Sequence, residues 1–332
     1  MKFKPLIILM GEPYSVFLEI FLKSYENCIK IRKNKYPIVL IGSQKLLIKQ
    51  IKHFNYKYKI KIINPTEINK IKNNNYINLI NVNFDKTNSI YKNLHSNAYI
   101  EKTFNIAFKL LNDKKVSGLI NGPISKKKFL NKKFLGITEY ILYKTKSNDA
   151  VMLIYNKILS VSPLTTHLPI KHVARNITKK QILKKVTLLN KFYLKKLKIR
   201  PKIAVLGLNP HCETTDKYSE ENKIIRPAIN LLIQKKINIK GPFSADTFFL
   251  KENYKSFNLV IGMYHDQVLT PIKTIFKFDA VNITVGLPFL RLSPDHGPNE
   301  KMFLKGKSNP LSFKRAIEFF NNFKWDFPKK KA

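Results

Sequence analysis

Short apolar runs that alternate with segments of helical periodicity restrict the fold of this chain more than any other feature. The runs lie at residues 5–10, 38–42, 60–64, 116–121, 158–164, 203–208, 257–263 and 281–285. Between several of them, apolar residues recur at steps of three and four, as they do on one face of a helix. Strands that alternate with helices are typical of an α/β fold, so we predict one with a largely parallel sheet.

Two of the intervening segments show the helical pattern most clearly. Segment 96–112 follows a candidate N-cap at Ser96, and segment 178–197 follows a candidate N-cap at Thr178. The residues expected to face the core are Ile100, Phe104, Ala107, Phe108 and Leu111 in the first segment and Ile182, Val186, Leu189 and Phe192 in the second.

The length of 332 residues allows two domains of ordinary size. The chain has no internal repeat and no flexible linker, so we expect the two domains to be interleaved along it. Cys28 and Cys212 are too few for a disulfide framework, which fits a reducing cytosol. The N-terminal run PLIILM ends at Gly11 and is too short for a signal peptide or a membrane span. We therefore expect a soluble, cytoplasmic protein with no membrane partner.

The formal net charge of +40 at pH 7 raises the alternative of a nucleic-acid-binding protein. The lysines are spread from end to end, however, beside abundant asparagine and isoleucine, and these three residue types share AT-rich codons. Base composition accounts for such an excess, and the sequence has neither zinc-finger spacing nor an RNP-type motif. We expect no specific nucleic-acid partner, while the charge favours small anionic substrates by electrostatic steering.

Three of the seven histidines come just after an apolar run. His167 follows the run in ILSVSPLTTHLP, His211 the run in IAVLGLNPHC, and His265 the run in NLVIGMYHDQ. In open α/β sheets, ligands bind outside the carboxyl ends of the strands. If these three strands are parallel neighbours, the three imidazoles lie together at that end of the sheet.

Neutral imidazoles are suitable ligands for a divalent ion, so we predict a metal site formed by His167, His211 and His265. Zn²⁺, Mg²⁺, Co²⁺ and Mn²⁺ are the candidate ions. With no carboxylate ligand, the ion keeps its charge and can lower the pKa of a bound hydroxyl and stabilise a developing carbonyl oxygen. Asp246 and Asp266 are candidates to orient the ligands or to accept a proton. A single such histidine is more often a hydrogen-bonded loop residue, but the repeated placement favours a site.

Several longer motifs occur in order along the chain. They are NGPISK (121–126), GITEY (136–140), TTHLP (165–169), GLNPHC (207–212), GPFSADTFF (241–249), MYHDQVLTPIK (263–273), VNITVGLPFLRLSPDHG (281–297) and NP (309–310). Together they resemble the 4-hydroxythreonine-4-phosphate dehydrogenase family of pyridoxal phosphate biosynthesis. Their joint occurrence is far more specific than any one motif.

The resemblance implies a fold like that of isocitrate and isopropylmalate dehydrogenases, with two interleaved α/β/α domains and a cleft between them. Residues 1–128 and 285–332 are then expected to form the first domain, on the nucleotide side. Residues 129–284 are expected to form the second, which carries the metal site and the dimer interface. The family works as a homodimer with a shared active site, and it uses NAD or NADP without a GxGxxG loop.

The resemblance also implies roles for individual residues. The metal ligands of the family match His167, His211 and His265. Its substrate-binding residues match Thr138, Lys273, Asn282 and Arg291, and the two cations suit a phosphate or a carboxylate. The region that holds the adenosine end of the dinucleotide matches His296, Gly297 and Asn309.

The chain departs from the family pattern in four places. Ile137 replaces the histidine of the usual GHTE motif, Val268 replaces the glycine of HDQG, and residues 14–18 lack two glycines of the N-terminal loop. After DHG the sequence is PNEKMFLKG instead of the usual TAFDIAGKG. These changes affect substrate and nucleotide contacts and leave the three metal ligands in place.

The resulting hypothesis is an NAD-dependent, metal-assisted dehydrogenase of 4-phosphohydroxy-L-threonine. Oxidation of the 3-hydroxyl gives a β-keto acid, which loses CO₂ to yield 3-amino-2-oxopropyl phosphate. One alternative is a paralogous dehydrogenase of another phosphorylated hydroxy acid, which the presence of Ile137 leaves open. A remote alternative is a non-catalytic nucleic-acid-binding protein with the same fold.

Overall fold

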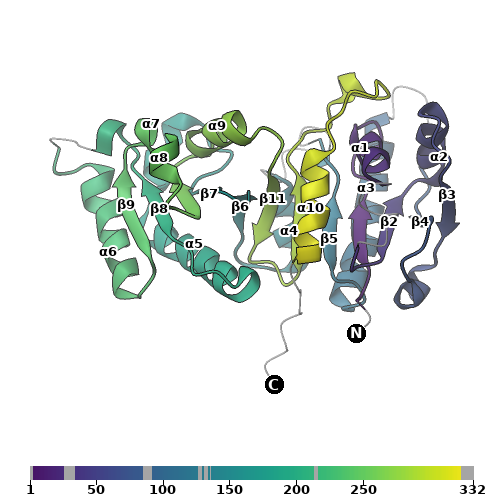
Figure 1. Cartoon of the computed structure of the whole chain (residues 1–332), viewed down its shortest axis with the longest axis horizontal. Coiled ribbons are helices and arrows are strands. Elements are labelled where there is room, and N and C mark those ends of the chain that lie inside the picture. The colour runs from purple at the N-terminus through teal and green to yellow at the C-terminus, as the bar shows by residue number, and fades with distance from the viewer. Residues whose placement is uncertain are drawn as a thin grey trace. The chain divides into compact units, whose positions relative to one another are not determined.

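The computed structural model describes residues 3–25, 34–84, 92–125, 129–130, 134, 136–212 and 216–322 (Figure 1). The chain forms two compact units, one made of Met1–Asn148 and Leu287–Ala332 and the other of Asp149–Gly286. The first unit is discontinuous in sequence, because the second is inserted into it. Cys28 and the lysines at the C-terminus lie outside the described residues.

The first unit is built on a parallel sheet with the strand order β3-β4-β2-β1-β5-β12. Its strands are β1 (Leu6–Leu9), β2 (Ile38–Gly42), β3 (Lys59–Ile62), β4 (Tyr76–Asn81), β5 (Gly118–Asn121) and β12 (Leu290–Pro294). Its helices are α1 (Phe17–Ser24), α2 (Gln44–His53), α3 (Lys92–Asn112), α4 (Ile137–Thr145) and α10 (Leu311–Asn322).

Helices cover both faces of this sheet. Ile7 and Leu9 of β1 belong to one apolar core together with Phe104 of α3. Side chains of a strand alternate between its two faces, so the intervening residues of β1 point the other way. On that other face α1 packs against α10, where the rings of Phe17 and Phe313 have centroids 5.5 Å apart. Figure 1 shows α1 and α10 in front of the strands and α3 behind them.

The second unit contains the strand order β11-β6-β7-β10-β8-β9. Strands β7, β10, β8 and β9 are parallel to one another, whereas β6 is antiparallel to both β11 and β7. The strands are β6 (Val151–Tyr155), β7 (Ser160–Pro163), β8 (Ile203–Leu206), β9 (Ile239–Phe243), β10 (Leu259–Gly262) and β11 (Val281–Val285). The helices are α5 (Lys179–Phe192), α6 (Arg226–Gln234), α7 (Ala245–Phe248), α8 (Lys251–Tyr254) and α9 (His265–Phe276).

Helix α9 packs closely on the strands that precede the predicted site. Two residues separate it from the end of β10, and it contacts β7 and β10. Val268 of α9 is fully buried in a core with Val161 of β7 and Val260 of β10. A Cβ atom on Gly262 would lie 2.4 Å from Val268 Cγ1, so only glycine allows the helix to approach the end of β10 in this way.

The predicted α/β fold class is confirmed, and so are both predicted helices. In α5 the Thr178 side chain accepts a hydrogen bond from Gln181 N at 3.2 Å, and the four predicted residues are buried. The five predicted residues of α3 are buried as well. The predicted cap of α3 is wrong, because the helix begins at Lys92 and Ser96 lies inside it. The residues just before Ser96, KNLH, contain no Pro or Gly that would stop a helix there.

The division of the chain differs from the predicted boundary between 128 and 129. The first unit continues to Asn148, because Tyr140 and Ile141 of α4 are buried in the core of that unit. The return to the first unit lies between Gly286 and Leu287, near the predicted position.

In the parts of the chain that the structure describes, no helix is both long enough and apolar enough to cross a membrane.

Candidate active site

The three predicted histidine ligands follow three neighbouring parallel strands of the second unit. His167 follows β7, His265 follows β10, and His211 follows β8. Strand β10 pairs with β7 on one side and with β8 on the other, in parallel in both cases. The three strands are therefore parallel neighbours, as the predicted site requires, and the three loops leave the same end of the sheet.

Two of these histidines have an uncommon backbone conformation. His167 has φ +57° and His211 has φ +58°, in the left-handed region. For a residue with a Cβ atom this conformation costs about 1–2 kcal/mol. Such residues are concentrated in active sites and ligand-binding turns, which is a feature that the sequence did not reveal.

The His265 ring is oriented by its neighbour Asp266. His265 Nδ1 donates to Asp266 Oδ1 at 2.6 Å, because an ionised carboxylate can only accept. In this tautomer the lone pair of the ring is on Nε2, which is the arrangement of a metal-binding histidine with a carboxylate partner.

Asp246 lies near His211 in a similar way, but at a greater distance. The Asp246 Oδ2 and His211 Nδ1 atoms are 3.7 Å apart. Asp246 Oδ1 accepts hydrogen bonds from Ser244 Oγ at 2.7 Å and from Thr247 N at 2.9 Å. The Ser244 bond is the main reason that the pKa of Asp246 lies below its ordinary value, with the Thr247 bond and His211 acting in the same direction. Asp246 is therefore an ionised, fixed carboxylate beside His211.

The ring geometry fits a divalent ion in part. The rings of His167 and His265 have centroids 6.3 Å apart. Two imidazoles on one tetrahedral ion have centroids about 5 Å apart, when each metal–nitrogen bond is roughly 2.0–2.1 Å. Among the described residues, no three His, Cys, Asp or Glu side chains already form a ligand set. A site with three imidazoles on one ion thus requires some of these side chains to move or a second copy of the chain to contribute.

A buried carboxylate, which the sequence reasoning missed, holds the loop of His211. Glu221 is 1% exposed, and its Oε1 accepts from Leu208 N at 2.7 Å and from Asn209 N at 2.9 Å. Its Oε2 accepts from Asn209 Nδ2 at 2.8 Å. Burial acts to raise the pKa of Glu221, but the bonds from Asn209 and Leu208 outweigh it and the pKa lies below its ordinary value. No sequence motif links Glu221 to this loop.

The second unit also contains two of the predicted substrate-binding residues. Lys273 is exposed on α9, the helix that begins with His265. Asn282 lies on β11, and its Oδ1 is buried without a hydrogen-bond partner. A buried acceptor of this kind is costly unless a ligand or water satisfies it.

The other two predicted substrate-binding residues belong to the first unit. Thr138 lies in the first turn of α4. Arg291 on β12 is fully buried, and its Nε donates to Asn121 Oδ1 at 2.7 Å. Burial lowers the pKa of Arg291 to about 10, and Glu139 acts in the opposite direction. The guanidinium therefore keeps its positive charge at neutral pH.

The predicted nucleotide-binding residues also lie in the first unit. Burial lowers the pKa of His296, and its Nε2 is buried without a partner. A Cβ atom on Gly297 would meet no atom within 4 Å. Asn309 Oδ1 accepts from Leu311 N at 2.9 Å at the start of α10, so this residue has a structural role as well.

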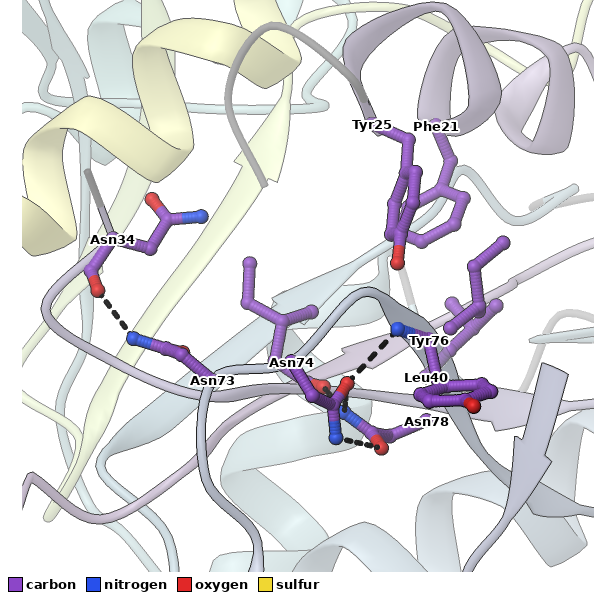
Figure 2. A pocket seen from close by; sticks show the side chains of 10 residues that line it. Phe21, Tyr25, Asn34, Leu40, Asn73, Asn74, Tyr76 and Asn78 are labelled. Atoms are coloured by element: carbon purple, nitrogen blue, oxygen red, sulfur yellow. Dashed lines mark hydrogen bonds between the residues drawn. The ribbon is translucent and has the colours of Figure 1, made fainter. Parts of the chain in front are cut away.

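A small cavity of about 10 Å³ lies elsewhere in the first unit (Figure 2). Tyr25, Asn34, Asn74, Tyr76 and Asn78 are among its lining residues. It lies near the amino ends of β2 and β4, whereas α/β proteins bind ligands at the carboxyl ends. None of the predicted site residues lines it.

Comparisons with known proteins agree on one family. The model of the family described as "Pyridoxal phosphate biosynthetic protein PdxA" matches residues 33–320. The chain is 37% identical to the 4-hydroxythreonine-4-phosphate dehydrogenase of Sulfurihydrogenibium sp. (strain YO3AOP1) over 319 residues, which are 94% of this chain and 96% of that protein. The protein of the same name from Aquifex aeolicus (strain VF5) is 32% identical over 328 residues, or 96% and 98% of the two chains. The crystal structure of the 4-hydroxythreonine-4-phosphate dehydrogenase from Klebsiella pneumoniae has a TM-score of 0.78 at 25% identity, covering 95% of this chain and 98% of that one.

Proposed function

The chain belongs to the PdxA family of pyridoxal phosphate biosynthesis, and from this premise we propose that it oxidises 4-hydroxythreonine-4-phosphate with NAD or NADP. It is an oxidoreductase, as its relatives over most of its length are named dehydrogenases. One observation carries the proposal. The loops of His167, His211 and His265 leave the same end of the sheet, because they follow three adjacent parallel strands. The relatives of this chain are named as dehydrogenases of 4-hydroxythreonine-4-phosphate, a phosphate ester that carries a hydroxyl group.

The proposed reaction removes a hydride from C3 and a proton from its hydroxyl oxygen. The resulting β-keto acid loses its carboxyl group as CO₂, and the enolate left behind takes up a proton on carbon to give 3-amino-2-oxopropyl phosphate. When bound, a divalent ion (Zn²⁺, Mg²⁺, Co²⁺ or Mn²⁺) would polarise the substrate oxygen as a Lewis acid, and the nicotinamide would accept the hydride. His167, His211 and His265 are the residues that would hold the ion.

The chain's own residues supply binding, orientation and proton transfer. Arg291 and Lys273 offer positive charge to the phosphate or carboxylate of the substrate. Arg291 suits this role because Asn121 holds its guanidinium in a fixed position. Asn282 Oδ1 is an acceptor available to a substrate N–H or O–H group. Asp266 fixes the tautomer of His265 and is also a candidate to accept the hydroxyl proton.

Five further residues have proposed roles. Thr138 is a further substrate contact, Asp246 is a second candidate for orienting a ligand or accepting a proton, and His296, Gly297 and Asn309 contact the adenosine end of the dinucleotide. The buried, unpartnered Nε2 of His296 supports a ligand in that region. We further propose that the enzyme works in the cytoplasm as a homodimer with a shared active site.

An assay of NADH formation tests this function. The purified chain is incubated with a divalent ion, NAD⁺ or NADP⁺, and 4-hydroxythreonine-4-phosphate, and in parallel with a sugar-acid phosphate that also carries a secondary hydroxyl. We expect a higher kcat/KM for the first substrate. A preference for the second would favour the paralogous dehydrogenase, for which Ile137 is the relevant departure, and an absence of both NADH and NADPH with either substrate would overturn the proposal.

A further inference from the structure

Hydrogen bonds join the three histidine loops where the strand pairing ends, and they differ on the two sides of β10. On the β7 side the backbone pairing continues into the loop of His167. Leu164 N donates to Gly262 O at 2.7 Å, and Thr165 N donates to Met263 O at 3.2 Å. The Thr165 hydroxyl donates to the same Met263 oxygen at 2.8 Å. Main-chain bonds therefore set the position of this loop relative to β10.

On the β8 side the pairing stops earlier. Within the described residues, the register between β10 and β8 ends at Ile261 opposite Val205. Beyond that point β8 bonds to its other neighbour, since Gly207 N donates to Phe243 O at 2.9 Å. The loop of His211 thus begins without the main-chain ladder to β10 that serves His167.

Gln267, the third residue of α9, spans this gap. Its Oε1 accepts a hydrogen bond from Met263 N at 2.6 Å, and its Nε2 donates to Gly207 O at 2.7 Å. The first bond resembles a capping box, in which a Gln or Glu at this helix position reaches back to the main chain. The second bond ties the start of the His211 loop to the turn that carries His265. An amide suits both roles, because it has an acceptor and a donor on one group.

We propose that Gln267 is a positioning residue of the metal site, which fixes through Gly207 where the His211 loop leaves the sheet relative to His265. The inference rests on the proposed function, because it takes these histidines to bind a divalent ion. Gln267 acts on the loops and not on the ion itself.

Cobalt titration of the metal-free, full-length chain tests this role without an activity assay. The visible absorption of bound Co²⁺ reports the number and geometry of its ligands, and thermal unfolding in chelator reports stability separately. Gln267→Leu removes both hydrogen bonds. Gln267→Glu has nearly the same shape and keeps the acceptor for Met263 N, but it places a carboxylate oxygen against Gly207 O. Gln234→Leu, at an exposed position of α6, is the matched control.

We expect both Gln267 variants to bind Co²⁺ about 10- to 100-fold more weakly, as is typical when a partner that orients a metal ligand is lost. Their spectra should change, while Gln234→Leu matches the parent chain. If a folded Gln267 variant unfolds at a lower temperature but binds Co²⁺ with parental affinity and spectrum, the residue is merely structural and the inference is wrong. A parent chain that binds no Co²⁺ would instead refute the proposed metal site itself, and this inference with it. The isosteric Gln267→Glu keeps the test decisive if Gln267→Leu does not fold.

Discussion

At the scale of single residues, two of the three candidate ligands have a carboxylate close by, and one of these carboxylates is hydrogen-bonded to the ring. Asp266 accepts from His265 Nδ1 at 2.6 Å, and the ionised Asp246 lies 3.7 Å from His211. In a chain with 61 Lys and Arg residues against 21 Asp and Glu residues, acidic partners at two of the three candidate ligands are informative. A carboxylate that holds one ring nitrogen makes the other a better metal ligand.

Replacement of a candidate ligand tests this interpretation. We expect His211→Ala to lower cobalt affinity and kcat/KM together by more than about 100-fold, because even the loss of a ligand's hydrogen-bond partner typically costs 10- to 100-fold. Equilibrium cobalt binding and steady-state kinetics measure the two quantities. His172→Ala, which changes a histidine outside the predicted set, should alter neither. Parental turnover in His211→Ala would exclude this residue as a ligand.

At the scale of the elements, the strands that carry the site could be predicted from the sequence, but their order could not. The runs before His167, His211 and His265 are apolar and short, and a strand lies within each of them. In space β10 lies between β7 and β8, although β8 comes before β10 in the chain. Only the packing of the whole sheet decides that order.

The apolar runs did not include every strand. Strand β4, YINLIN, lies in a stretch rich in Lys and Asn, and β12 contains the buried Arg291, so the hydrophobic signal of both is weak. Hydrogen bonds that form only in the fold, such as the one from Arg291 to Asn121, make room for such polar groups. Polarity does not explain why β6 was missed, since its sequence VMLIY is apolar. Glu221 could not be found because no motif links it to Leu208 and Asn209.

The contact between β10 and α9 leads to a stability prediction. A Cβ atom on Gly262 would lie 2.4 Å from Val268 Cγ1, so Gly262→Ala should lower the free energy of unfolding by about 1–3 kcal/mol. Urea unfolding of the unmodified chain, the Gly262→Ala and Val268→Ala variants and the double variant measures these free energies. Val268→Ala removes the clashing methyl groups, so Gly262→Ala should cost less in that background. Equal costs in both backgrounds would show that the two residues do not compete for space. Gly297→Ala, where a Cβ meets nothing within 4 Å, is the control.

The loop after β8 leads to a prediction about pH. The folded-state pKa of Glu221 is below its ordinary value, so its contribution to stability is present above about pH 4.5 and is lost as the pH falls through the folded-state pKa. Glu221→Gln should therefore lower the free energy of unfolding at neutral pH, by about 1–3 kcal/mol for the disrupted buried bonds. The difference from the parent chain should shrink on acidification. Denaturant unfolding across this pH range checks it, with the exposed Glu252→Gln as control; a difference that stays constant with pH would contradict it.

At the largest scale, the candidate residues are distributed over both units of the chain. The three histidines belong to the second unit, whereas Arg291, Thr138 and the nucleotide-binding candidates belong to the first. The described part of a single chain holds no preformed set of three metal-binding side chains. We propose that the active site is completed by assembly, in a homodimer.

Hybrid dimers test whether the active site is shared. His167→Ala, His211→Ala and His265→Ala chains, each inactive alone, are mixed in pairs under conditions that exchange subunits. If one ion takes ligands from two chains, at least one pairing creates a site without a mutated residue, and part of the activity returns. Mass spectrometry of the hybrids confirms exchange. Verified hybrids that stay inactive in all three pairings would contradict a shared site.

The most direct test of the account is the position of a bound ion. A crystal of the cobalt-loaded protein, with anomalous data collected at the cobalt edge, locates the ion independently of any assumed ligand. We expect one strong peak per site with the imidazole nitrogens of His167, His211 and His265 at about 2.0–2.2 Å, from one chain or from two. A fully loaded crystal in which the peak lies away from these three rings would contradict the account.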